Sequence, residues 1–239
     1  MPCRLTAVTF DAHDPAGLVR FWAGLLGRDA DGTLLPGSAG QLGLRFVESE
    51  ADKVARNRMH LHLTSTGAAD QQKTVDSALR LGAGHLDVGQ LPEEGHVVLA
   101  DPEGNELCVI EPGNAFLAGC GFLGELTCEG PREVGVFWAE ALRWLLVWDR
   151  DDETAVQSPL GGTKVSWGGE PATLDDRRSR QRLDLAVPGG DLEAEVARLT
   201  GLGARVLGDA DHGALALADV GGTEFWLRPT TARSADRHP

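Results

Sequence analysis

Residues 99–112 read LADPEGNELCVIEP, and this stretch decides the fold. Asp101 to Asn105 combine the residue types of a tight turn, because proline fixes one backbone φ angle while glycine and asparagine tolerate a positive one. The apolar residues on either side predict two strands that this turn joins as a hairpin. The need for a turn explains the motif without any function. What it leaves open is the role of Cys108 in the second strand.

The same hairpin returns later in the chain. LADVGGTEFWL at 217–227 repeats LADPEGNELCV at 99–109, with an offset of 219 − 101 = 118 residues. Upstream, RMHLHL at 58–63 corresponds to RQRLDL at 180–185. Nearer the start of each half, DPAGLVRFWAGLLG at 14–27 corresponds to PREVGVFWAEALRW at 131–144. The chain is therefore a tandem duplication. We predict a first domain at 1–114, a second at 119–230 and a polar tail at 231–239.

Each half divides again into two similar units. In the first unit, Leu18, Phe21, Trp22 and Leu25 have the spacing of a helix that packs on a sheet, and Asp14 followed by a proline suits the start of that helix. Strands are predicted in the first half at 5–10, 29–35, 42–47, 60–64, 85–88, 96–100 and 106–110, and helices at 14–26 and 70–81. The second half repeats the pattern, so we predict an α+β fold of four βαβββ units.

The composition narrows the function. A net charge of −14 disfavours nucleic acid as a partner, since phosphate backbones are bound by clustered Lys and Arg. No apolar run approaches the length of about 18 residues that a membrane span needs. The four cysteines have no C-x-x-C spacing and are expected to be free thiols. We therefore expect a cytoplasmic protein, monomeric or homodimeric, with a small-molecule ligand as its partner.

The paired units and the D-P-x-G-N turn resemble the vicinal oxygen chelate superfamily, which includes glyoxalase I, extradiol dioxygenases and bleomycin-resistance proteins. The likeness is strongest to its glyoxalase-like branch. The segments that carry it are 21–22 with 25–27, 57–63, 81–83 and 101–109. The first half matches nearly throughout, whereas the second half loses the proline and asparagine of the turn. The resemblance implies two glyoxalase-like domains with cupped mixed sheets around a ligand cavity.

Metal-using relatives take ligands from the first and last strands of their units, usually His or Glu. Carried over to this sequence, the first-half positions fall on Ala7, His60 and Cys108, and those of the second half on about Leu123, Arg182 and Trp226. Most of these residues are unsuitable for a hard divalent ion. The resemblance therefore implies a metal site that has lost most of its ligands, and no cofactor is expected. The alternative is a divalent metal bound by softer ligands in the first half.

Two candidate sites follow from strand alternation, which places residues i and i+2 on one face. The first is a cluster of His60, His62, Glu106 and Cys108, with Cys108 as a metal ligand, a nucleophile or, as its residue type favours, a small buried apolar side chain. The second is an aromatic-lined cavity in the second half. It would contain Trp148, Trp167, Arg182, Asp184, Glu224 and Trp226. The alternative is that these rings only fill the core.

Three hypotheses remain open. The first is a metal-independent protein that binds a hydrophobic or aromatic, antibiotic-like small molecule. The second is a metal-dependent lyase, isomerase or dioxygenase, in which His60 and a neighbour hold the ion while Glu106 or another carboxylate moves a proton. The third is that one half serves as structural support. Whether the units pair within each half or across the halves is also open.

Overall fold

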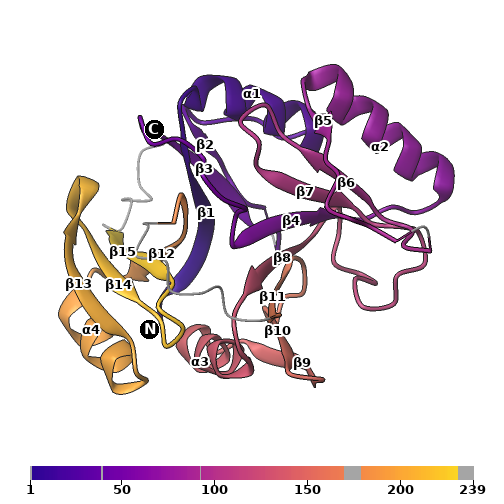
Figure 1. The fold of residues 1–239 in the computed structure, drawn as a ribbon. Helices are drawn as coiled ribbons and strands as arrows, with labels where there is room; N and C mark the ends of the chain where they lie inside the picture. The colour runs from indigo at the N-terminus through magenta and orange to yellow at the C-terminus, as the bar shows by residue number, and fades with distance from the viewer. Residues whose placement is uncertain (1, 39, 92, 170–178, 231–239) are drawn as a thin grey trace, which may run out of the picture.

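The computed structural model describes residues 2–38, 40–91, 93–169 and 179–230, and the predicted tail at 231–239 lies outside these ranges. The described residues form an α+β fold with two mixed sheets and four α-helices (Figure 1), as predicted. The first half contains β1 (Arg4–Ala12), α1 (Pro15–Leu26), β2 (Leu34–Leu35), β3 (Gly43–Glu48), β4 (Met59–Leu63), α2 (Ala68–Leu81), β5 (Gly84–His85), β6 (Val97–Ala100) and β7 (Glu106–Val109). The second half contains β8 (Leu123–Glu129), α3 (Arg132–Leu142), β9 (Leu145–Arg150), β10 (Glu153–Gln157), β11 (Lys164–Gly168), β12 (Gln181–Pro188), α4 (Leu192–Gly201), β13 (Arg205–Ala210), the short 3-10 helix η1 (Asp211–Gly213), β14 (Ala214–Ala218) and β15 (Glu224–Thr230).

The units pair across the two halves of the chain. The first and fourth units share a seven-stranded sheet in the order β13-β14-β15-β12-β1-β3-β2, and the second and third share an eight-stranded sheet in the order β5-β6-β7-β4-β8-β11-β10-β9. At the two joins, β1 pairs antiparallel with β12, and β4 pairs antiparallel with β8. Each sheet therefore takes one unit from each half, which settles the question that the sequence left open.

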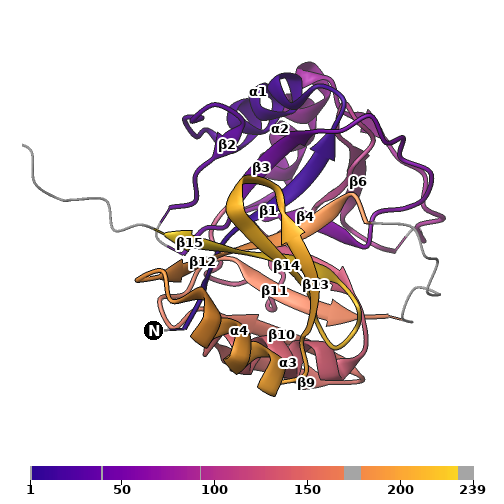
Figure 2. The same ribbon diagram turned by 90° about the vertical axis from the view of Figure 1, so that its left-hand side faces the viewer.

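The helices lie in two pairs. In both views α1 and α2 lie at one end of the molecule and α3 and α4 at the other (Figures 1 and 2). Leu18, Phe21, Trp22 and Leu25 of α1 are buried, as their spacing predicts, and the side chain of Asp14 accepts a hydrogen bond at the start of the helix. One continuous apolar core includes residues of both sheets and of all four helices. Within the described residues, no helix is long and apolar enough to cross a membrane.

One predicted strand is largely replaced by a turn. Asp31 and Leu34 exchange backbone hydrogen bonds of 2.8 and 3.0 Å, and Gly32 between them has a φ of +61°. Of the strand predicted at 29–35, only the short β2 forms. In the described part of the chain the first unit has three strands, one overlapping each predicted range, and each other unit has four, so the sheet of the first unit has seven strands and the other eight.

The turn at 101–105 joins the two sheets within one half of the chain. Oδ2 of Asp101, in the last hairpin of the eight-stranded sheet, accepts a hydrogen bond of 3.1 Å from Nε1 of Trp22, in the helix of the first unit. The second half repeats this contact, because Nε1 of Trp138 donates to Oδ2 of Asp219 over 2.9 Å. The recurring Asp and Trp residues therefore tie together units that belong to different sheets.

Glu103 adds a second tie in the first half. Its carboxylate accepts hydrogen bonds from the backbone N–H groups of His13, at 2.9 Å, and Asp14, at 2.6 Å, just before α1. A carboxylate is favourable there because the free N–H groups give a helix start a partial positive charge. The corresponding position in the second half is Gly221, which has no side chain to make this contact.

Replacing Trp22 by phenylalanine removes one of these ties and should destabilise the fold. The change deletes the indole N–H and leaves a buried carboxylate oxygen with one donor fewer, so we expect the free energy of unfolding to fall by about 1–3 kcal/mol. Urea unfolding followed by circular dichroism measures this loss. Trp144→Phe is the matched control, since Trp144 is only half-buried. Equal losses in the two variants would contradict a role for the Trp22–Asp101 hydrogen bond.

Candidate functional site

Three of the predicted cavity residues meet on the inner face of the eight-stranded sheet, which is the face turned away from its helices. His60 and His62 alternate along β4, and their ring centroids are 4.9 Å apart. Cys108 on β7 is the register partner of His62. One donor atom from each of these three residues lies within 4.8 Å of the other two. We call His60, His62 and Cys108 the donor group.

Glu106 does not join the donor group. Its Oε1 lies 2.7 Å from Nζ of Lys53, and the backbone N–H of Asn57 contacts the same carboxylate at 3.3 Å. Glu106 therefore fastens the segment before β4 to the sheet. Of the predicted cluster of His60, His62, Glu106 and Cys108, Glu106 is thus the member that the structure places apart.

Glu125 is the carboxylate that lies beside the donor group. It is the register partner of His62 on β8, and its Oε2 lies 2.6 Å from Nδ1 of His62. The sequence placed this position at about Leu123, two residues too early. The reason is the connection to the helix: it is 22 − 9 = 13 residues from Thr9 to Trp22 in the first unit but 138 − 127 = 11 from Thr127 to Trp138 in the third.

A signal for Glu125 was nevertheless present in the sequence. In LGELTCE at 123–129, a charged residue and a threonine alternate with Leu126 and Cys128, which are both buried in the core. Such alternation places Glu125 on the face opposite to the core. Because the spacing between strand and helix differs in the two units, the alternation along the strand locates this position better than its distance from the helix does.

Charge in this cluster is concentrated on the His62–Glu125 pair. Burial alone would lower the pKa of His62, but hydrogen bonds with Cys108 and Glu125 outweigh it and raise the pKa to about 9. Burial would raise the pKa of Glu125, but the hydrogen bond from His62 lowers it. Burial and the neighbouring positive charge of His62 lower the pKa of His60 to about 3. At neutral pH the cluster therefore contains a neutral His60 beside a charged pair.

The pair predicts a stability that depends on pH. Because the pKa of His62 is higher in the folded protein than the ordinary value of 6.5, its contribution is complete below pH 6.5 and is lost as the pH rises through about 9. We expect the metal-free protein to lose up to about 3 kcal/mol of unfolding free energy between pH 7 and 10 from this group. Urea unfolding at several pH values measures the loss, and His62→Asn should flatten this slope. An unchanged slope in the variant would contradict the raised pKa.

A cavity of about 420 Å³ opens beside the pair. His62 and Glu125 line it together with Thr127, Ser166, Asn114, Phe116 and Trp148. The rings of Phe116 and Trp148 meet edge to face with centroids 5.5 Å apart. Phe116 belongs to the segment that links the two halves of the chain, so the cavity draws on three parts of the sequence.

The predicted aromatic cavity is divided between the two sheets. Trp148 and Trp167 both line the cavity just described, and Trp167 also stacks on Trp138 with centroids 6.3 Å apart in the core beneath α3. Trp226 belongs to the seven-stranded sheet, with Glu224 accepting a hydrogen bond of 2.6 Å from its Nε1. Trp167 therefore packs in the core and also contributes to the wall of the cavity.

Arg182 and Asp184 lie on the inner face of the seven-stranded sheet. The first unit contributes Arg45 and Asp11 to the same face, and the fourth unit contributes Arg228. Neither the sequence pattern nor the family resemblance pointed to these three residues. Their strands could be recognised, but their proximity to Arg182 and Asp184 follows only from pairing across the halves.

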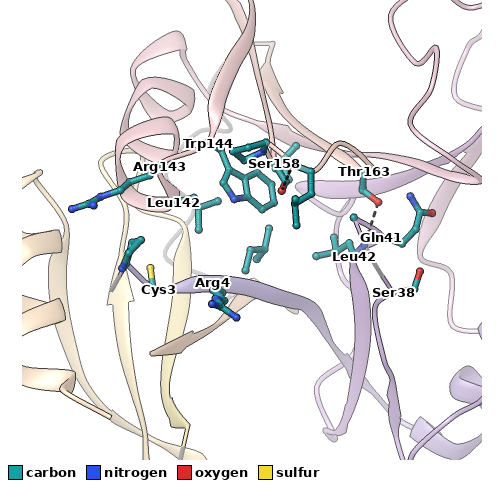
Figure 3. Close-up of a pocket in the computed structure, with 16 residues that line it drawn as sticks. Cys3, Arg4, Ser38, Gln41, Leu42, Leu142, Arg143, Trp144, Ser158 and Thr163 are labelled. Atoms are coloured by element: carbon teal, nitrogen blue, oxygen red, sulfur yellow. Dashed lines mark hydrogen bonds between the residues drawn. The ribbon is translucent and has the colours of Figure 1, made fainter. Parts of the chain in front are cut away.

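A further pocket of about 530 Å³ lies between the start of β1, the end of α3 and the loops at 40–42 and 158–163 (Figure 3). At its wall the backbone N–H of Leu42 donates to Oγ1 of Thr163 over 3.2 Å. The two loops approach so closely that a Cβ on Gly162 would lie 1.7 Å from the carbonyl oxygen of Gly40. The predicted site residues are not among its lining residues, so this pocket is separate from the donor group.

These features define a class of protein: a tandem chain of βαβββ units that pair into two cupped mixed sheets. The family model described as a glyoxalase-like domain matches residues 7–110 and again 125–228. The chain therefore belongs to the glyoxalase-like domain family, in the vicinal oxygen chelate superfamily, with two copies of the domain. No functionally curated protein matches the sequence.

Solved structures agree with this fold. Glyoxalase I from Zea mays is similar, with a TM-score of 0.63 and 12% identity over 94% of this chain and 92% of that one. A proposed dioxygenase from Bacillus subtilis has a TM-score of 0.60 and 14% identity over 95% of this chain and 85% of that one. At such identities the likeness extends to the fold alone.

Proposed function

We propose that this protein is a metal-dependent enzyme of the lyase, isomerase or dioxygenase type, acting on a small oxygenated substrate in the cavity of the eight-stranded sheet. The observation that supports the proposal is the donor group, whose three potential ligand atoms lie within 4.8 Å of one another. The contact between His62 of this group and Glu125 faces a cavity of about 420 Å³. This proposal takes the second of the three hypotheses over the metal-independent binder.

The chemistry of the donor group fits a soft or borderline divalent ion. Two imidazoles and a thiolate are ligands that suit zinc or iron rather than magnesium or calcium. His60 is neutral at physiological pH because its pKa is lowered to about 3, so its lone pair is available to a metal. His62 would release a proton on binding, because its pKa is raised to about 9. Three protein ligands are the number that catalytic zinc sites use, which leaves a position for substrate.

Glu125 would orient His62 in this site. Metal-bound histidines commonly donate their second ring N–H to a carboxylate, and Nδ1 of His62 already lies 2.6 Å from Oε2 of Glu125. The metal would supply a Lewis acid that polarises a substrate oxygen. Glu125 also lines the cavity, so it replaces Glu106 as the carboxylate placed to exchange a proton with a bound substrate.

The metal-independent binder is the second candidate, and a different observation favours it. Phe116 and Trp148 form an edge-to-face pair at the cavity, which suits a hydrophobic or aromatic ligand. On this proposal the cavity holds its ligand by ring contacts, and the His62–Glu125 pair fixes its orientation. Quenching of tryptophan fluorescence by an aromatic compound in metal-free protein, lost in Trp148→Leu, is the expected sign of this function.

Cobalt(II) substitution tests the metal proposal. Metal-free protein is titrated with Co²⁺ and its absorption spectrum recorded, because a thiolate ligand gives a charge-transfer band that disappears in Cys108→Ser. In parallel, Zn²⁺, Mn²⁺, Ni²⁺ and Mg²⁺ are compared by thermal shift, since an ion bound only by the folded state raises the melting temperature. We expect a one-to-one endpoint and a preference for Zn²⁺ over Mg²⁺. Absence of both the band and any metal-dependent shift would overturn the proposal.

A further inference from the structure

The inner face of the seven-stranded sheet carries a buried network of charges. Asp184, which is fully buried, accepts from Nε of Arg45 at 2.8 Å and from Nε of Arg228 at 2.9 Å. Arg182, with its side chain 2% exposed, donates from Nη1 to Asp11 over 2.6 Å. The five residues come from four strands, β1, β3, β12 and β15. All of them except Asp184 line a cavity of about 560 Å³, and Asp184 lies beneath it.

The charges of this network do not cancel. Arg45, Arg182 and Arg228 carry three positive charges against the two negative charges of Asp11 and Asp184. Glu48 and Asp211 also line the cavity, but both are exposed to solvent at its mouth, where water screens them. Glu224 is engaged by Nε1 of Trp226. The inner part of the cavity is therefore cationic.

Donors are also left over. Arg45 and Arg228 both bind Asp184 through Nε, so that carboxylate does not use the terminal nitrogens of their guanidinium groups. Nη1 of Arg228 donates over 3.4 Å to the backbone carbonyl oxygen of Asp211. Among the described residues, Nε of Arg182 and Oγ1 of Thr9 are buried without a hydrogen-bond partner. Buried polar groups are normally paired, because an unpaired one costs about 1–3 kcal/mol. A ligand with several acceptor oxygens would provide hydrogen-bond partners for guanidinium donors that face this cavity.

Trp226 holds the arginines in place. The guanidinium carbon of Arg182 lies 4.0 Å from the centroid of the indole ring, and that of Arg228 lies 5.0 Å from it. These contacts fix two long side chains in one orientation, which reduces the entropy that binding would otherwise cost. Trp226 stands where the eight-stranded sheet has Cys108, and Ala7 stands where it has Glu125. At the positions of His60, His62 and Cys108, the seven-stranded sheet thus carries Arg182, Asp184 and Trp226.

We propose that the seven-stranded sheet forms a second ligand site, which binds a small oxyanion through Arg45 and Arg228. The chemistry is that of a carboxylate or phosphate group, because the planar guanidinium fork matches two oxygens of either group. The site is separate from the donor group and does not depend on a metal. A chain with both sites would bind an anionic small molecule on one sheet and carry out metal chemistry on the other.

Isothermal titration calorimetry tests this site on the full chain after treatment with a chelator, so that no metal ion can hold the anion at the other sheet. Two probes are used, inorganic phosphate and succinate, each against potassium chloride at equal ionic strength. We expect saturable binding of at least one probe, and the better probe identifies the source of the oxyanion. Arg45→Gln should weaken binding at least about tenfold, whereas Arg20→Gln, at an exposed arginine of α1, should leave it unchanged.

Arg45→Lys is a second test in case Arg45→Gln does not fold. It keeps the positive charge and removes only the planar guanidinium group that can bind two oxygens at once. It should also bind more weakly than the original chain, with an unchanged circular dichroism spectrum. Failure of both probes to bind above the chloride control would overturn the proposal. So would binding that Arg45→Gln and Arg45→Lys both leave unaltered.

Discussion

Replacing His62 by alanine is expected to lower the affinity for Zn²⁺ at least about 100-fold. The change removes one of three potential ligands, and it also removes the only contact through which Glu125 could act on the metal in the proposed arrangement. Competition against a chelator of known affinity, monitored at pH 8, measures the effect. Below pH 9 the proton on His62 competes with the metal, so the affinity of the unaltered protein should rise with pH by about tenfold per unit.

Two further variants separate binding from orientation. His85→Ala, at an exposed histidine of β5 in the same sheet, should leave the affinity unchanged. Glu125→Gln should lower it by about 10–100-fold, which is the usual effect of losing a carboxylate that orients a histidine ligand. If His62→Ala and His85→Ala bind Zn²⁺ equally well, the donor group does not hold the metal.

The sequence predicts most of the fold because the decisive signals are local. The stripe on α1 and the N-cap at Asp14 involve residues within a few positions of one another, and both agree with the structure. The turn at 101–105 is equally local. Its role was not predictable in the same way, because the hydrogen bond from Trp22 to Asp101 spans 79 residues and connects different sheets.

The candidate site was predictable where one half of the chain supplies it. His60, His62 and Cys108 come from one unit, and alternation along two strands was enough to bring them together. Glu125 and the contact of Arg45 with Asp184 both cross the halves of the chain. Such contacts depend on which units pair, and the apolar pattern of the strands is the same whether pairing occurs within a half or across the halves. Which side chains of the two halves meet on the inner face of a sheet therefore follows only from the observed strand order.

Replacing Asp184 by asparagine is expected to cause the largest loss of stability. Asp184 is fully buried and binds two guanidinium groups, so its removal leaves Arg45 and Arg228 without a counter-charge. Breaking a buried ion pair in this way typically costs about 3–5 kcal/mol. That is a large part of the unfolding free energy of about 5–15 kcal/mol that an ordinary domain has. Urea unfolding at pH 7 measures the loss, which should appear as a lower midpoint at an unchanged slope.

Asp29→Asn is the matched control, because Asp29 is exposed and the change removes the same charge without opening a buried network. A loss below about 1 kcal/mol in Asp184→Asn would mean that water reaches the two guanidinium groups and that the network is not desolvated. The variant also connects to the proposed oxyanion site. With its internal carboxylate gone, the cavity should gain more stability from added phosphate or succinate than the unaltered chain does, since the anion then replaces the counter-charge that Asp184 supplied.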